Sequence, residues 1–209
     1  NKATVTAKAR STAYGSPSLD VSVGASARAT GTVTVHRGTA QVGTATLSNG
    51  LATVALDRSL AVGSHTLTVR YGGDSLTEAA SATTTLAVVK AKPKVSIKAG
   101  KAYRGVATKV TISVKSGVTP TGKVRVQVGG KTVTTKTLSK GKVTFKLSKK
   151  LKLGKHKIRA TYLGSKQHSK VAKNLNVKIV KKKAKISSFA SGTKRVKVGK
   201  RYGDTVKLT

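Results

Sequence analysis

An internal repeat with an offset of 91 residues constrains this chain of 209 residues more than any other feature. Residues 31–72 and 122–163 align at that offset without a gap. The segment LAVGSH at 60–65, for example, corresponds to LKLGKH at 151–156. A repeat of this length indicates that one structural unit is built twice, so both copies are expected to share a fold.

Each copy has the pattern of about seven short β-strands. KVRVQV at 123–128 places its three valines on one side of an extended strand and its polar residues on the other. Turn segments such as SNG at 48–50 and SKG at 139–141 separate the strands. The expected strands lie near 3–9, 18–23, 31–37, 40–47, 51–56, 64–71 and 81–89, and near 94–98, 108–115, 122–128, 131–138, 141–147, 155–162 and 171–180. The pattern predicts an all-β chain of tandem immunoglobulin-like antiparallel sandwiches, with a small barrel as the alternative.

The repeat also divides the chain. We expect one domain over 1–90, a second over 91–182, and the first strands of a truncated third repeat over 183–209, where RYGD at 201–204 returns. Two strands cannot close a core. The chain therefore either continues beyond its last residue, which we favour, or self-associates by pairing these strands with a neighbouring molecule. The linker KAKPK at 90–94 is stiff and charged, which predicts an extended rod.

The positive charge is concentrated in the second half of the chain. The sequence holds 42 Lys and Arg against 5 Asp and Glu. Residues 1–90 carry a net charge of +4, whereas residues 91–209 carry +33. The segment 91–182 has 26 basic residues and no acidic one. Its lysines must therefore be solvated or meet an external anion, and their mutual repulsion opposes compaction.

The repeat shows that the fold does not require this charge. The outward positions Thr32 and Thr34 of the first copy become Lys123 and Arg125 in the second, whereas the inward valines are kept. The third, sixth and seventh strands share a sheet in such a sandwich. Six basic residues are therefore expected on one face as a candidate polyanion-binding site: Lys123, Arg125, Lys155, Lys157, Arg159 and Lys178. A solvated surface is the alternative.

Other motifs offer little chemistry. The segment GVTPTGKV at 117–124 imitates a phosphate-binding loop but ends in Val and precedes a strand rather than a helix. His65 and His156 occupy equivalent positions, where a structural role is expected. Asp74 is expected to cap a turn, with weak calcium contact as the alternative. We predict no catalytic residue, no cofactor and no metal site, because 91–182 contains no carboxylate and the chain no cysteine.

The segments TGTVTV at 30–35, LAVGSH at 60–65 and YGGD at 71–74 resemble the bacterial immunoglobulin-like repeats that occur in tandem in exported, often actinobacterial, proteins. The second copy departs from that pattern, because Ser165 stands where the first has Asp74. The resemblance implies a spacer, an adhesion module or an appendage of a secreted enzyme. It implies no catalytic residues.

Together these features predict a non-enzymatic, extracellular or cell-surface spacer and attachment module. Its basic second domain would contact an anionic cell-wall polymer, extracellular DNA or an acidic polysaccharide. Few aromatic residues are available for base stacking, so contact with nucleic acid is expected to be unspecific and sensitive to salt. No apolar run is long enough for membrane insertion. The alternatives are a subunit of an extracellular fibre, or an appendage of a secreted enzyme whose catalytic domain lies outside this chain.

Overall fold

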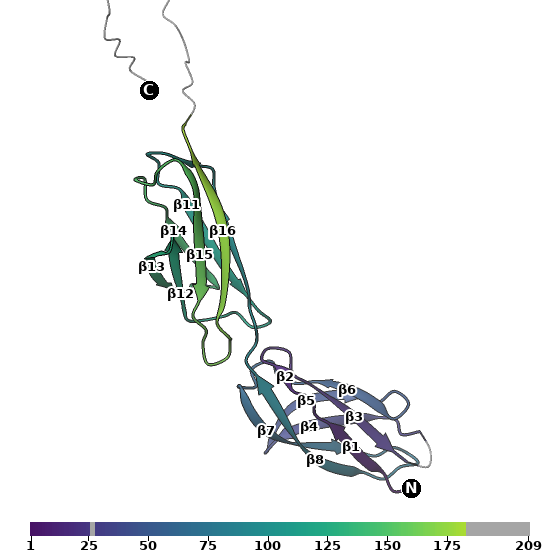
Figure 1. Ribbon diagram of the computed structural model, residues 1–209. Coiled ribbons are helices and arrows are strands. Elements are labelled where there is room, and N and C mark those ends of the chain that lie inside the picture. The colour runs from purple at the N-terminus through teal and green to yellow at the C-terminus, as the bar shows by residue number, and fades with distance from the viewer. Residues whose placement is uncertain (26–27, 183–209) are drawn as a thin grey trace, which may run out of the picture.

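The computed structural model describes residues 1–25 and 28–182, and these residues form two β-sandwiches joined end to end (Figure 1). The strands of the first sandwich lie between residues 4 and 89, and those of the second between residues 94 and 180. The prediction for 183–209 lies outside the described residues. The all-β, immunoglobulin-like prediction is confirmed, and the barrel alternative is wrong because each unit has two separate sheets.

The first sandwich packs a three-stranded sheet against a five-stranded one. The three-stranded sheet has the order β1 (Thr4–Lys8), β3 (Ser18–Gly24) and β6 (Leu51–Ala55). The five-stranded sheet has the order β2 (Thr12–Ala13), β8 (Ala80–Val89), β7 (Gly63–Tyr71), β4 (Thr32–Arg37) and β5 (Ala40–Thr46).

The second sandwich repeats this topology. Its three-stranded sheet has the order β14 (Lys142–Lys146), β11 (Lys109–Lys115) and β9 (Lys94–Ala99). Its five-stranded sheet has the order β10 (Ala102–Tyr103), β16 (Val171–Val180), β15 (Gly154–Tyr162), β12 (Lys123–Val128) and β13 (Lys131–Thr137).

Each sandwich has eight strands rather than about seven. The additional strands are β2 and β10, which pair in parallel with the last strand of their own sandwich. Each is two residues long, so it cannot show the alternation that identifies a strand in a sequence.

The inward-facing residues of both copies fill equivalent positions in the two cores. Val33 and Val124 are fully buried, and Tyr71 and Tyr162 are at most 2% exposed. Burying one such aliphatic side chain stabilises the fold by about 1.5–3 kcal/mol. The outward residues of the same strands make no comparable contribution, so they are free to differ between the copies.

The tight turn between β13 and β14, which belong to different sheets, repeats a turn that the first copy makes between β5 and β6 with a better-suited residue. Asn49 and Gly50 have positive φ angles of 53° and 77°, and Lys140 and Gly141 have 47° and 70°. Two consecutive positive φ angles are typical of a type I′ hairpin turn. A Cβ on Gly141 would lie 2.8 Å from the backbone oxygen of Val114, so glycine is required there. Lysine adopts this conformation less readily than asparagine, yet Lys140 occupies it.

The junction between the sandwiches is built from backbone contacts as well as a short linker. The Ala91 N–H donates a hydrogen bond to the Gln167 carbonyl at 3.0 Å, and the Ser169 N–H donates to the Ala91 carbonyl at 2.9 Å. Arg58 of the first sandwich donates to the carbonyls of Gly15 and, across the junction, Gly117. The end-to-end arrangement agrees with the rod that the linker composition predicts (Figure 1).

His168 is buried in this junction. It is 2% exposed, and its ring lies edge-on to Tyr14 of the first sandwich, with the ring centroids 5.5 Å apart. Its Nδ1 lies 3.4 Å from the Ser165 hydroxyl, and its Nε2 has no hydrogen-bond partner among the described residues. Burial lowers the pKa of His168, and the nearby Val118 backbone partly opposes that shift.

We therefore expect acid to weaken the junction. The folded chain favours neutral His168, so its contribution is complete above the ordinary pKa of 6.5 and declines as the pH falls below that value. Thermal unfolding of the wild type should show this decline as the pH is lowered below 6.5, and His168→Gln should flatten that part of the curve. His36→Gln is the control and should keep the decline. A decline of the same size in His168→Gln would contradict the assignment.

Candidate functional site

The six basic residues predicted as a site lie on the outer face of the second five-stranded sheet. Lys123 and Arg125 belong to β12, Lys178 belongs to β16, and the remaining three belong to β15, which pairs with both. The expectation that the third, sixth and seventh strands share a sheet is therefore confirmed. We call this surface the five-stranded face, and it consists of Lys123, Arg125, Lys155, Lys157, Arg159 and Lys178.

Five members of the five-stranded face are exposed, and Arg125 is half-buried. Arg125 lies beside Thr161 in the ladder between β12 and β15, and Thr161 is only 3% exposed. The Arg125 Nε is buried and makes no hydrogen bond within the described residues. Arg125 is therefore less open to a ligand than its five neighbours.

The opposite side of the same sandwich carries a second basic surface that the sequence analysis did not identify. We call it the three-stranded face, because it is the outer surface of the sheet of β9, β11 and β14. All its basic members are exposed, and they are Lys94, Lys98, Lys109, Lys115, Lys142 and Lys146. In the sequence, these lysines alternate with the inward-facing apolar residues of their strands, which indicates that they face outward. The strand pairing is needed to show that they share one surface.

Three pairs of lysines stand directly opposite each other on neighbouring strands. Lys94 is opposite Lys115 and Lys109 is opposite Lys146 on the three-stranded face, whereas Lys155 is opposite Lys178 on the five-stranded face. Like charges at directly opposed ladder positions destabilise a sheet.

The first sandwich places uncharged residues at the same three ladder positions. The corresponding pairs are Thr4 with Gly24, Ser18 with Ala55, and Ser64 with Ala87. The topology is shared, so the charge pairs are not a condition for folding.

Nothing within the second sandwich compensates this charge, because 91–182 contains no Asp or Glu. Among the described residues, ion pairs join Arg10 to Asp20 at 3.8 Å and the Asn1 amino group to Glu78 at 4.0 Å. Both belong to the first sandwich. The counter-charges of the second sandwich must therefore come from outside it.

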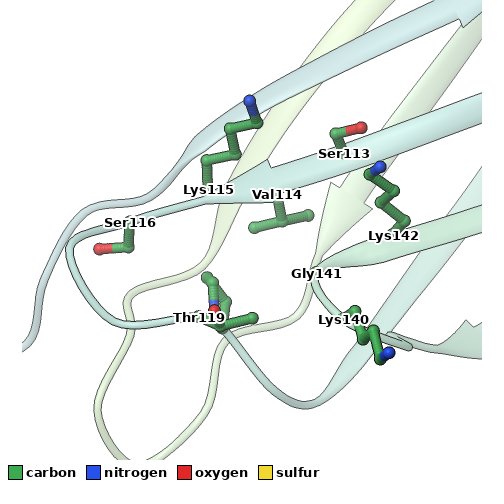
Figure 2. A pocket seen from close by; sticks show the side chains of 9 residues that line it. Ser113, Val114, Lys115, Ser116, Thr119, Lys140, Gly141 and Lys142 are labelled. Carbon is green, nitrogen blue, oxygen red and sulfur yellow. The ribbon is translucent and has the colours of Figure 1, made fainter.

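A pocket of about 220 Å³ opens at one end of the three-stranded face. Figure 2 shows it between β11, the segment that follows β11, and the turn at Lys140 and Gly141. Lys115, Lys140 and Lys142 are among its lining residues, and the Lys140 ammonium points away from the other two (Figure 2). Its hydroxyl groups come from Ser113, Ser116 and Thr119. Such a lining offers donors to an anion and no carboxylate to repel it.

The residues predicted to be structural have structural partners. The His65 Nε2 lies 2.7 Å from the Ala61 carbonyl oxygen, and the His156 Nε2 lies 2.8 Å from that of Lys152. The equivalent bonds confirm a shared structural role. The segment at 117–124 leads into β12 and includes its first two residues. Its Gly117 carbonyl accepts the hydrogen bond from Arg58, so it forms part of the junction.

Asp74 caps the turn after β7, as predicted. It accepts hydrogen bonds from the Thr30 N–H at 2.8 Å and the Leu76 N–H at 2.9 Å. These bonds hold the pKa of the Asp74 carboxyl well below its usual range. Within the described part of the chain, no group of three or more His, Asp or Glu residues is arranged to hold a metal ion. The same residues include no helix with the length and apolar character needed to cross a bilayer.

Comparisons with known proteins identify the repeated unit. The family model described as bacterial Ig-like domain (group 3) matches residues 5–89 and again residues 95–180. A search of curated proteins found no match.

Several solved structures are similar in fold. The fibronectin(III)-like modules of Clostridium thermocellum CbhA are 17% identical with a TM-score of 0.36, over 85% of this chain and 95% of that one. The BSP domain of a biofilm-associated protein is 18% identical with a TM-score of 0.31, over 84% and 30%. A bacterial ice-binding adhesin is 18% identical with a TM-score of 0.35, over 86% and 65%. The chain thus spans less than two thirds of the last two structures.

The opposed lysine pairs generate a stability prediction. The triple variant Lys94→Thr, Lys109→Ser and Lys155→Ser gives one member of each pair the residue of the first sandwich. It should raise the free energy of unfolding at low salt by roughly 0.5 kcal/mol per pair, and the gain should shrink in about 1 M NaCl. Chemical denaturation at both salt concentrations measures the effect.

A matched control removes the same charge from exposed loop positions, as Lys101→Ser, Lys149→Ser and Lys166→Ser. These lysines stand outside the opposed pairs, so the control should gain less stability. An equal gain in both variants would show that net charge, rather than the opposed pairs, carries the cost.

Proposed function

Because the chain belongs to the bacterial Ig-like domain (group 3) family, we propose that it is a non-enzymatic spacer and attachment module of a bacterial cell-surface or secreted protein. The second sandwich contacts a linear anionic polymer, and an anionic cell-wall polymer is the proposed ligand. Binding rests on charge alone, so DNA and other polyanions bind to the same surface without sequence preference. We assign no catalytic residue, cofactor or metal ion to this activity.

The opposed lysine pairs are the observation that carries the proposal. A surface that serves only for solubility needs no lysines directly across a ladder, and the first sandwich has none at these positions. An anion placed above such a pair is attracted by both ammonium groups. Its binding therefore relieves the repulsion that the fold carries in its absence.

The composition of the second sandwich fits unspecific contact. Its basic residues are lysines except for Arg104, Arg125 and Arg159. The lysine ammonium is a compact, hydrated point charge, whereas arginine offers a planar fork for defined two-point recognition. Tyr162 and Phe145 are buried in the core, which removes them as stacking platforms. Affinity on this surface would come from the release of counterions from the polymer.

The first sandwich is proposed as the spacer. It has the same topology, but residues 1–90 carry a net charge of only +4. The contacts of Arg58 and Ala91 hold it against the end of the second sandwich. A joined pair of this kind presents the basic unit at a defined distance from the other end of the chain.

A salt titration of binding tests the proposal. The full chain is compared with a variant in which the five-stranded face takes the residues of the first sandwich: Lys123→Thr, Arg125→Thr, Lys155→Ser, Lys157→Thr, Arg159→Thr and Lys178→Ala. The probes are poly(glycerol phosphate), a short DNA duplex and neutral dextran. Wild-type affinity for both anionic probes should fall steeply with salt. For the duplex, the variant should reduce the log–log slope by up to about 5, since each phosphate contact contributes about 0.9.

A control variant removes six basic residues outside both faces, namely Lys2, Lys8, Arg10, Arg37, Arg70 and Lys90, each to Ala. It matches the loss of net charge and should leave most of the slope in place. If both variants lose the same amount of the log–log slope, binding depends on net charge and not on a particular surface of the second sandwich. If neither anionic probe shows salt-dependent binding near physiological salt, the proposal is overturned, and the basic residues form a solvated surface.

A further inference from the structure

The three-stranded face combines two clusters of lysines with a centre of short polar side chains. Lys94, Lys115 and Lys142 lie at one end of the sheet, and the other three lysines lie at the opposite end. Lys115 lies six positions after Lys109 along β11, so the two ends are about 20 Å apart. Short hydroxyl side chains stand between them, and these are Ser96, Thr111, Ser113 and Thr144. A surface of this form accommodates an extended polymer along the strands.

The pocket lined by Lys115, Lys140 and Lys142 lies at one end of this face (Figure 2). The equivalent residues of the first sandwich are Gly24, Asn49 and Leu51, which carry no charge. Lys140 holds the left-handed turn conformation that suits Asn49 better. Position 140 therefore carries a positively charged residue beside the pocket, although lysine is disfavoured in this backbone conformation.

The two faces of the second sandwich act independently. Packed sheets lie about 10 Å apart, and the side chains of each outer face extend further in opposite directions. The Debye length at physiological ionic strength is about 8 Å, so charges on one face are largely screened from a ligand on the other. A linear polymer that lies along one face also leaves the opposite face open.

We propose that the three-stranded face is a second binding surface for a linear polyanion, so that one chain bridges two polymer strands, one on each side of the second sandwich. The inference rests on the proposed function and extends it from attachment to cross-linking. The ligand is a phosphate-bearing or similarly charged linear polymer. At the end of the face beside the pocket, Lys115 and Lys142 attract one of the polymer's anionic groups (Figure 2).

The experiment counts ligands on the full chain. Oligothymidylate of about eight nucleotides and polyphosphate of similar length are titrated by calorimetry at low salt, where each phosphate contact adds most to binding. Three variants are compared with the wild type. The first neutralises the five-stranded face as above. The second neutralises the three-stranded face as Lys94→Thr, Lys98→Ser, Lys109→Ser, Lys115→Gly, Lys142→Leu and Lys146→Ala. The third is the control variant that lacks six basic residues outside both faces.

The wild type and the control variant should bind two oligomers, and each face variant should bind one. An equal mixture of donor-labelled and acceptor-labelled oligomers should give energy transfer on the wild type and lose it on either face variant. Sedimentation confirms that one chain carries both oligomers. Thermal unfolding verifies that each variant is folded, and Lys115→Gly with Lys142→Leu serves as a smaller variant if the full one unfolds.

The possible failures are distinguishable. One oligomer on the wild type, lost only in the five-stranded-face variant, would overturn the second surface and leave the proposed attachment function intact. Two oligomers on the three-stranded-face variant would also overturn it. If neither probe binds, both proposals are overturned. Equal results with oligothymidylate and polyphosphate would establish that charge rather than the nucleobase is recognised, whereas binding of oligothymidylate alone would contradict the proposed ligand chemistry.

Discussion

The packing of inward-facing side chains between two sheets is the constraint on which the rest of this structure depends. Residues such as Val33, Val35 and Tyr71, and their counterparts in the second sandwich, are almost fully buried. They hold the register of every ladder, because a shift of one residue would turn the apolar set outward and the polar set inward. With the register held from inside, the outward positions can change without altering the fold.

The second sandwich uses this freedom to carry charge. Its inward residues match those of the first sandwich, whereas its outward residues place six basic side chains on each face. The core supplies the stability that tolerates Lys94 opposite Lys115 and Lys155 opposite Lys178. The cost of each pair is small beside the burial of a single valine. A charged surface of this density is therefore compatible with a small β-sandwich, provided that the core is complete.

The junction differs from the two cores, because hydrogen bonds and the ring contact between His168 and Tyr14 take part in it. It relies on the Arg58 guanidinium, two backbone hydrogen bonds at Ala91 and the buried ring of His168. With no carboxylate in 91–182, a proton on His168 would have no buried counter-charge from its own sandwich. The relation between the two sandwiches is thus more sensitive to conditions than either core.

Much of the fold could be predicted from the sequence, because the alternation of valines with polar residues and the repeat at 91 residues are local, countable signals. They determined the tandem sandwiches, their main strands and the residues of the five-stranded face. The tertiary structure alone decided the two-residue strands β2 and β10, the contacts of Arg58 and His168, and the three-stranded face. These features depend on which strands become neighbours in the folded chain. The periodic pattern of the sequence does not specify contacts between residues that are far apart along the chain.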